Sequence, residues 1–128
     1  MENQETIQIS LQVIVDQKVS FESHGKWLYP LFDLEDFLQD HPLPMASALV
    51  RDKVIGKAAA LLLIRLDAGR VHGELMSELA VETLTEADVP YTYDQWVPRI
   101  DCKTETLLAE VDDPEQAYAI LCQRAGRC

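Results

Sequence analysis

The chain has 128 residues, of which 48% are hydrophobic and 26% are charged. That size and composition predict one globular domain over residues 1–128, with a core of its own and flexible ends at 1–10 and 124–128. The 22 acidic residues outnumber the 11 Lys and Arg residues, so the net charge is −11. Phosphate backbones and anionic membranes repel such a chain, which argues against nucleic-acid polymers and membranes as partners.

The start of the chain and its cysteines indicate a cytoplasmic protein. Residues 1–6 are polar and acidic, unlike a signal peptide, and the longest apolar run, 58–64, is far shorter than the ~20 residues of a membrane helix. An odd number of cysteines without zinc spacing indicates free thiols rather than a disulfide framework. These cysteines are Cys102, Cys122 and Cys128.

A hairpin and a helix are expected first. Residues 11–16 are apolar and β-branched and 18–23 alternate with a period of two, so both segments predict strands, with the turn at Gln17. Apolar residues then recur at helical spacing over 28–38, with acidic residues between them. This pattern is typical of an amphipathic helix, and Pro42 ends it.

The middle of the chain alternates strands and helices. Residues 46–51 predict a short strand, and the Ala- and Leu-rich run 56–66 predicts a helix buried against a sheet. Residues 71–76 predict the next strand, after which Ser77 suits the N-cap of a helix. The segment 91–97 is rich in aromatic and β-branched residues and predicts the last strand.

Two short helices are expected in the tail. Asp101 is a suitable cap for the first of them. Asp113 is a suitable N-cap for the second, with Pro114 at its first position and Gln116 placed to complete a capping box. Gly126 is the expected end of this helix.

Alternation of strands and helices after a hairpin predicts an α/β fold. We expect a five-stranded mixed sheet with helices on both faces, in a three-layer α/β/α arrangement. No internal repeat, low-complexity segment or linker divides the chain, so the prediction is a single domain.

The basic residues are concentrated in one stretch. Residues 51–70 carry five basic and two acidic side chains, a net charge of +3, which leaves −14 on the rest of the chain. The five basic residues are Arg51, Lys53, Lys57, Arg65 and Arg70. A positive stretch in an acidic protein is a candidate site for a small anion. The alternative is a solvated helix end with ordinary surface charges.

Within that stretch, residues 52–60 (Asp-Lys-Val-Ile-Gly-Lys-Ala-Ala-Ala) follow a predicted strand and open a helix. Free backbone N–H groups at a helix start favour an anion, and Gly56 would let a ligand approach the backbone. We therefore predict a ligand site, without metal or cofactor, made of Asp52, Lys53, Gly56, Lys57 and Ser77. In the alternative interpretation, Asp52 only caps the helix and Gly56 makes a tight helix–sheet contact.

Cys102 and Glu105 are the candidate catalytic residues. They are three residues apart, so they share one face of a helix. If Asp101 is the cap, Cys102 occupies the first helical position, where the helix dipole makes a thiol more reactive. The alternative is an inert thiol, because no histidine is near in sequence. His72 and Glu74 have the H-x-E spacing of a zinc deaminase, but they lie inside a predicted strand, and we treat this match as coincidence.

From Leu11 to Leu121 the chain resembles an uncharacterised bacterial family, a domain of unknown function assigned to the cytidine deaminase-like superfamily. The residues that carry the resemblance are 52–60, Ser77-Glu78, Val97-Pro98, Cys102 with Glu105, and 112–115. The resemblance implies a three-layer α/β/α fold of the deaminase type. The chain departs from the family pattern where Trp27 replaces a glycine, where Lys103 replaces a proline, and where the loop 99–101 is shortened.

The resemblance also implies that the zinc chemistry of deaminases is absent. Zinc deaminases carry an H-x-E motif where this chain has Ser23-His24-Gly25, and a Pro-Cys-x-x-Cys motif where it has 52–56. The zinc cysteines and the catalytic glutamate are therefore missing, and no metal-activated water is available to attack an amino-bearing carbon. We expect a deaminase scaffold that does not deaminate by the zinc route.

Three functions are compatible with these features. The first is a module that binds a small anionic metabolite, such as a nucleotide, through Lys53, Lys57 and the N–H groups near Gly56. The second is a thiol-dependent enzyme, or a sulfur or redox protein, that uses Cys102 with Glu105 as acid/base or polar anchor. The third is a structural or partner-binding homo-oligomer.

Overall fold

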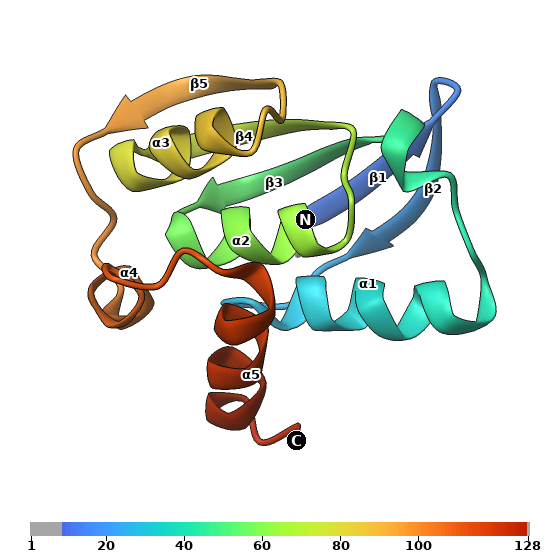
Figure 1. Ribbon diagram of the computed structural model, residues 1–128. Coiled ribbons are helices and arrows are strands. Elements are labelled where there is room, and N and C mark those ends of the chain that lie inside the picture. The colour runs from blue at the N-terminus through green and yellow to red at the C-terminus, as the bar shows by residue number, and fades with distance from the viewer. Residues whose placement is uncertain (1–8, 128) are drawn as a thin grey trace, which may run out of the picture.

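The computed structural model describes residues 9–127, in which five strands form one mixed sheet of order β2-β1-β3-β4-β5 (Figure 1). The strands are β1 (Leu11–Val15), β2 (Lys18–Ser23), β3 (Leu49–Ile55), β4 (Arg70–Ser77) and β5 (Tyr91–Val97). The predicted α/β fold with a five-stranded mixed sheet is confirmed. The flexible ends predicted for the chain fall in part on residues 1–8 and 128, which lie outside the described residues.

The predicted hairpin is confirmed. β1 and β2 pair in antiparallel orientation, and Asp16 and Gln17 connect them with φ angles of 51° and 69°. Two successive residues in the left-handed region form the turn whose twist matches that of the flanking strands. The hairpin therefore places β2 at one edge of the sheet, with β1 next to it.

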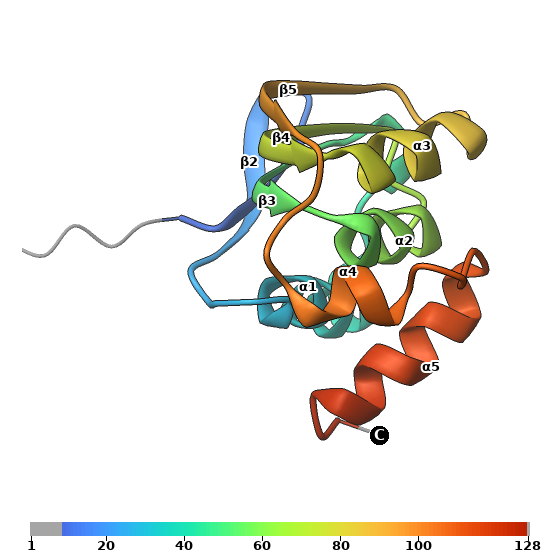
Figure 2. The same ribbon diagram turned by 90° about the vertical axis from the view of Figure 1, so that its left-hand side faces the viewer.

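The chain connections place the three crossover helices on one face of the sheet. β1 runs antiparallel to β2 and β3, while β3, β4 and β5 are parallel, so β2 to β5 share one direction. The helices α1 (Tyr29–Asp40), α2 (Lys57–Arg65) and α3 (Glu78–Glu86) connect successive strands of this set. Each crossover steps the same way across the sheet, so right-handed connections place all three helices on the same side. Figure 2 shows them together beside the sheet.

The opposite face of the sheet carries no helix among residues 9–127, so the predicted helices on both faces, and the α/β/α layering, are wrong. A row of polar side chains crosses all five strands on this face. In register order it consists of Glu22, Gln12, Arg51, His72 and Thr92. A sheet face with such side chains is stable in contact with water, and this explains why no helical layer covers it.

A second helical layer lies outside α2. Residues 57–63 of α2 are all buried, because α2 lies between the sheet and the two tail helices, α4 (Lys103–Leu107) and α5 (Pro114–Arg124). The Ala- and Leu-rich sequence of α2 suits this position, since apolar side chains point in every direction. The layers are therefore the sheet, then α1 to α3, then α4 and α5.

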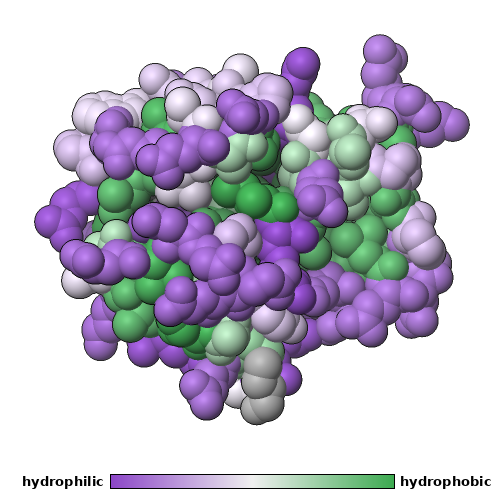
Figure 3. All heavy atoms as spheres, viewed as in Figure 1, coloured by the Kyte–Doolittle hydropathy of each residue, from purple (hydrophilic) through white to green (hydrophobic). Residues whose placement is uncertain are grey.

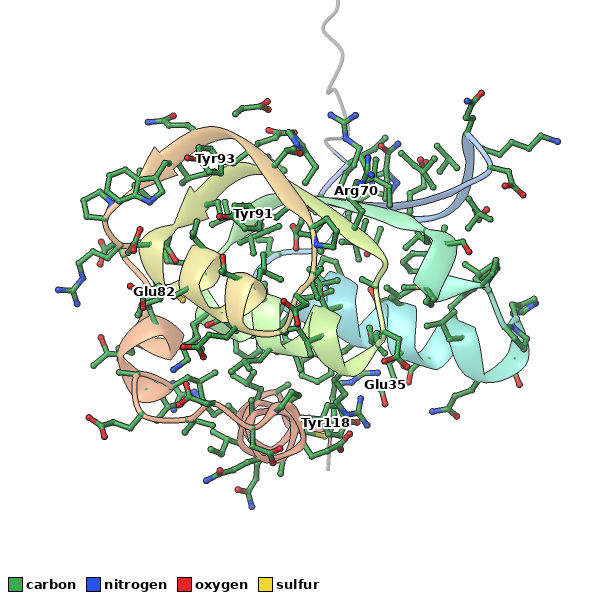
Figure 4. The ribbon with its side chains drawn as sticks, turned by 45° about the horizontal axis from the view of Figure 1, so that its top comes forward. Glu35, Arg70, Glu82, Tyr91, Tyr93 and Tyr118 are labelled. Atoms are coloured by element: carbon green, nitrogen blue, oxygen red, sulfur yellow. The ribbon has the colours of Figure 1, made fainter. Side chains whose placement is uncertain are left out.

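Arg65 joins three of these helices at the end of α2. Its Nη1 donates to Glu35 of α1 at 2.5 Å, and its Nε donates to Glu115 of α5 at 3.1 Å. The guanidinium also lies 3.7 Å from the centre of the Tyr118 ring. Burial alone would lower the pKa of Arg65, but the hydrogen bonds and charges of the two carboxylates raise it. Figure 4 shows Glu35 and Tyr118 near each other where α1 and α5 approach.

Two predicted boundaries need correction. The strand expected at 46–51 corresponds to β3, which begins and ends later, at Leu49 and Ile55, because residues 45–47 form a 3-10 turn. Asp52 and Lys53 therefore lie within the strand. Asp52 is therefore not the cap of α2, whose N-cap is Gly56. The N-cap of α4 is Cys102 rather than Asp101, so the thiol precedes the helix instead of occupying its first position. That five-residue helix is short, so its dipole is weak at the thiol.

The other helix ends follow the sequence. Ser77 caps α3, where its Oγ accepts a hydrogen bond from the Ala80 N–H at 3.2 Å. Asp113 caps α5 and accepts from the Gln116 N–H at 2.9 Å. After α5, Gly126 takes a φ of 72°, the left-handed conformation expected just beyond a helix end.

The cysteines differ from the expectation. Cys102 is a free thiol, whereas Cys122 in α5 is disulfide-bonded, so the prediction of free thiols is wrong for Cys122.

Hydrophilic side chains cover much of the face seen in Figure 3, with apolar ones visible between them. This surface agrees with the excess of acidic residues in the composition. None of the helices within residues 9–127 combines the length and the apolar character that a membrane span requires.

Candidate functional site

A cavity of about 570 Å³ opens at the edge of the sheet where the parallel strands end. Its walls come from the loop 25–28 after β2, from β3 and the start of α2, and from the loop 99–102 after β5. These segments meet because β2, β3 and β5 point the same way, which brings their carboxyl ends to one edge. Ligands of open α/β sheets bind at this edge, and the volume lies within the range of about 300–1,000 Å³ typical of small-molecule sites.

The cavity combines apolar walls with an excess of positive charge. Its lining includes the three basic residues Lys26, Lys53 and Arg99, from separate parts of the chain, and the two acidic residues Asp52 and Asp101. Lys26 and Arg99 are far apart in sequence, and neither was predicted as a site residue. The loops after parallel strands share one edge of the sheet, and this rule was the signal that could have identified them.

The positive stretch of the sequence does not form one surface. Lys53 is its only basic residue among the lining residues of the cavity. Arg51 lies in the polar row on the open face, Arg65 joins α1 to α5, and Arg70 lies at the opposite end of β4. The local charge of +3 is therefore divided among separate parts of the structure.

The start of α2 is bonded to a carboxylate of the same chain. The backbone N–H of Lys57 donates to Oε2 of Glu105 at 2.7 Å, and Ser77 Oγ donates to the same oxygen at 3.2 Å. Oε1 of Glu105 accepts from the Ile100 N–H at 3.1 Å. Glu105 is only 2% exposed, and it places a negative charge at the positive end of the helix dipole. Glu105 and Ser77 therefore lie behind the cavity wall.

Lys57 also points away from the cavity. Its ammonium group donates to the Ala109 carbonyl at 3.0 Å and to Asp112 at 2.8 Å, in the segment between α4 and α5. The residue is 4% exposed, and these two partners offset the cost of burying its charge. Lys57 thus connects α2 to the tail of the chain.

The absence of a side chain at Gly56 allows Ile100 and Glu105 to pack against its backbone. A Cβ atom at this position would lie 2.5 Å from Ile100 Cδ1 and 2.8 Å from Glu105 Oε2. Its φ of −100° is accessible to any residue, so the close packing, not the backbone conformation, requires glycine. This geometry favours the alternative of a tight contact, although with the loop after β5 and with α4 rather than with the sheet.

Asp52 is the titratable group that the structure perturbs most clearly toward neutrality. Burial raises the pKa of its carboxyl from 3.8 to about 7, and the negative charge of Glu74 adds to this effect. Hydrogen bonds from the backbone N–H groups of Lys53 and Val54 oppose the shift without cancelling it. The carboxyl lines the cavity and retains partial access to solvent. A group of this kind changes its charge near neutral pH and is able to take up or release a proton there.

Cys102 lines the same cavity as Asp52. It is half-buried, and its Sγ lies 3.0 Å from Thr104 Oγ1. Its predicted partner Glu105 is engaged behind the wall, so the structure does not bring that carboxylate into the cavity lining with the thiol. Within residues 9–127, no group of three or more His, Cys, Asp or Glu side chains is arranged to hold a metal ion.

Trp27 is a further lining residue that the sequence analysis did not select as a site residue. Its φ is 55°, a left-handed conformation that a bulky residue rarely adopts and glycine adopts without strain. In this chain the conformation carries a large aromatic ring into the cavity lining.

The comparisons with known proteins extend these observations. The crystal structure of a DUF1893 family protein, TM1506 from Thermotoga maritima, is similar, with a TM-score of 0.80 and 28% sequence identity. The similarity covers 91% of this chain and 80% of that one. Among curated proteins, none matches this chain. The family described as TM1506, domain of unknown function DUF1893, matches residues 5–124, and the chain therefore belongs to that family.

Proposed function

We propose that this protein binds a small anionic metabolite in the cavity at the carboxyl edge of the sheet. The observation that carries the proposal is the meeting of Lys26, Lys53 and Arg99, from three separate elements, in one apolar-walled cavity of an acidic protein. A local excess of positive charge in a concave site attracts a small anion, while the surrounding negative charge repels larger polyanions.

The proposed ligand contacts differ in part from those expected from the sequence. Asp52, Lys53 and Gly56 line the cavity, so these three keep their role as candidate ligand contacts. Lys57 and Ser77 act on the ligand indirectly, because they hold the start of α2 and the Glu105 carboxylate in place. Lys26 and Arg99 replace them as the additional cationic contacts.

We also infer that the fold belongs to the cytidine deaminase-like superfamily and lacks its zinc chemistry. In support, the segments that correspond to the zinc motifs, Ser23-His24-Gly25 and 52–56, contain no cysteine and no His-x-Glu pair. The purified protein should contain no stoichiometric zinc and should not deaminate cytidine. Zinc bound at one equivalent per chain, measured by elemental analysis, would contradict this inference.

Calorimetric titration with pyrophosphate and with the nucleoside monophosphates tests anion binding. Replacing Lys53 and Arg99 together by alanine should weaken the binding of any bound probe by at least about a hundredfold, since each charge-assisted hydrogen bond contributes about 1.5–3 kcal/mol. Lys18→Ala is a matched control, because Lys18 opens β2 in the hairpin and is not a lining residue of the cavity. Equal affinity in the double variant and the control would refute the proposal.

A second candidate function is thiol chemistry at Cys102. The observation in its favour is that Cys102 and the proton-exchanging carboxyl of Asp52 line one cavity. The rate of Cys102 alkylation against pH tests it. A thiol coupled to Asp52 should change its alkylation profile in Asp52→Asn, whereas an ordinary profile with a pKa near ~8.5 in both proteins argues for an inert thiol.

A further inference from the structure

We propose that the ligand of the cavity carries a planar aromatic ring next to its anionic group, and that Trp27 is the surface on which this ring stacks. This inference rests on the proposed anion site and names the chemical class of its ligand, an aromatic anion of the nucleotide type. Four features of the cavity support it: the exposure of the indole, its aromatic supports, its backbone conformation, and the charges around it.

The indole of Trp27 is exposed within a concave site. Trp27 is 40% exposed while it forms part of the cavity lining. A large aromatic side chain left open to water inside a pocket is available for contact with a ligand, because every planar ring offers a face for stacking. Leu28, the next residue in the chain, is buried, whereas Tyr29 is 42% exposed. Of these two exposed rings, only that of Trp27 belongs to a lining residue of the cavity.

Neighbouring rings hold the indole in place. Tyr29 packs against it edge-on, with ring centres 5.3 Å apart and an angle of 71° between the planes. Phe32 is a second neighbour, tilted by 43° with its ring centre 6.5 Å from that of the indole. A ring fixed by two aromatic neighbours loses little conformational entropy when a ligand binds to its free surface.

The backbone at Trp27 is held in a conformation that opposes this residue type. Its φ of 55° lies in the left-handed region, and a hydrogen bond from the Tyr29 N–H to the Lys26 carbonyl at 3.1 Å closes the turn around it. Glycine would adopt the same conformation without strain. Strained conformations of bulky residues occur preferentially at functional sites, where the side chain is needed in one position.

The charged groups of the cavity complete the match to an aromatic anion. Lys26 precedes Trp27 directly in the chain, and Lys53 and Arg99 line the same space. These cations suit a phosphate or carboxylate group. The carboxyl of Asp52 can hydrogen-bond the polar edge of a heterocycle, as a donor when protonated and as an acceptor when ionised.

Trp96 provides a matched control for Trp27, since the chain contains only these two tryptophans. Trp96 is 44% exposed, which is close to the value for Trp27, but it is not a lining residue of the cavity. Its indole N–H instead donates to Glu78 at 3.0 Å, at the start of α3. The variants Trp96→Phe and Trp27→Phe therefore leave one fluorescent indole inside the cavity or one outside it.

The experiment is a fluorescence titration of the two variants with the nucleoside monophosphates, with ribose phosphate as the probe that lacks the ring. We expect at least one nucleotide to quench the remaining indole of Trp96→Phe and to leave that of Trp27→Phe unchanged. The best nucleotide should bind roughly ten- to a hundredfold more tightly than ribose phosphate, the factor that base–aromatic stacking supplies.

Trp27→Gly separates the role of the ring from that of the fold. This variant removes the backbone strain, so its melting temperature should stay close to that of the wild type, while its affinity for the nucleotide should fall to that for ribose phosphate. Should Trp27→Gly unfold, Trp27→Leu keeps an apolar side chain and should show the same loss.

The outcomes distinguish this inference from the proposed function. If ribose phosphate and the nucleotides bind with equal affinity, or if Trp27→Gly and Trp27→Leu bind nucleotide as well as the wild type does, the stacking role is wrong while the anion site stands. If neither pyrophosphate nor any nucleotide nor ribose phosphate binds, the proposed function fails, and the inference fails with it.

Discussion

Lys53 and Lys57 are four residues apart in sequence, yet they belong to two different regions of the molecule. Lys53 lies in β3 and lines an open cavity of ligand size. Lys57 begins α2 and is itself buried, and its ammonium group donates to Ala109 and to Asp112, which lie on the exposed segment between the tail helices. The chain changes direction at Gly56, between the strand and the helix. Equal charges in a short motif therefore lie in two different settings, the lining of a cavity in one case and hydrogen bonds between α2 and residues 109–112 in the other.

The carboxylates of the two regions also differ in their hydrogen bonding. In the open region Asp52 has a pKa raised to about 7, because burial disfavours its charge more than two backbone N–H groups stabilise it. In the enclosed region Glu105 accepts hydrogen bonds from two backbone N–H groups and from Ser77, at the N-terminus of a helix. We therefore expect Glu105 to stabilise the fold and Asp52 to reduce its stability at neutral pH.

The largest expected effect is in the enclosed region. Glu105→Ala leaves the N–H groups of Lys57 and Ile100 and the hydroxyl of Ser77 without their acceptor in a buried place. Because unsatisfied buried donors cost about 1–3 kcal/mol each and relax in part, we expect a loss of about 3 kcal/mol in the free energy of unfolding. Urea denaturation followed by circular dichroism measures it.

Glu105→Gln is the control for that variant, since its side-chain carbonyl still accepts hydrogen bonds. Its loss should be smaller, about 1–2 kcal/mol, because a neutral group replaces a charged acceptor at the helix start. A change of less than about 0.5 kcal/mol in Glu105→Ala would place it among ordinary surface substitutions. That result would show that the Glu105 carboxylate is not an integral part of the enclosed region.

The sequence predicted the elements better than it predicted their layering. The bounds of β2 and β5 and the caps at Ser77 and Asp113 follow from alternation and from hydrogen-bonding side chains, which act locally. The single-sided arrangement of the helices was missed, although the right-handed crossover rule dictates it once the strand order is known. The strand order depends on long-range pairing of β1 between β2 and β3, which no local pattern encodes.

The candidate site was predicted in part for the same reason. Residues 52–56 could be located because they cover the end of β3 and the N-cap of α2, but the direction of each side chain depends on tertiary packing. Lys57 and Glu105 were interpreted as functional, and they meet instead in a buried hydrogen-bonded cluster. Trp27 and Arg99 reach the cavity from loops whose positions only the assembled sheet defines.

A smaller effect is expected from the open region, with the opposite sign. Because the pKa of Asp52 is higher in the folded state than in the unfolded chain, the folded state binds the additional proton between about pH 4 and pH 7. The contribution of Asp52 to stability is therefore lost as the pH rises through this window. Asp52→Asn removes the charge and should raise the free energy of unfolding by about 1–2 kcal/mol at pH 8, with little change at pH 4.

Unfolding curves of the wild type and Asp52→Asn across this pH range test the sign. The other charged groups near Asp52 are the same in both proteins: Glu74 on β4 and, around the cavity, Lys53, Arg99 and Asp101. The difference between the two unfolding curves therefore reports the contribution of the Asp52 charge. Destabilisation of Asp52→Asn at pH 8 would indicate that the ionised carboxylate is well solvated or firmly paired. The contrast with Glu105 would then disappear.

The smallest effect on stability is expected for Lys53, and the comparison of Lys53 with Lys57 is the most direct test of the difference between the two regions. Lys53→Ala should change the free energy of unfolding by less than about 0.5 kcal/mol, as for most partly exposed side chains, but should weaken the binding of pyrophosphate or a nucleotide by about tenfold. Lys57→Ala should show the reverse, a loss of about 1–2 kcal/mol in stability with the affinity of the folded protein unchanged, because the two hydrogen bonds from α2 to Ala109 and Asp112 are lost. Thermal denaturation and calorimetry on the same two variants measure both quantities. If both lysines weakened binding equally without a cost in stability, residues 53–57 would act as one anion-binding segment, and the division into an open and an enclosed region would be wrong.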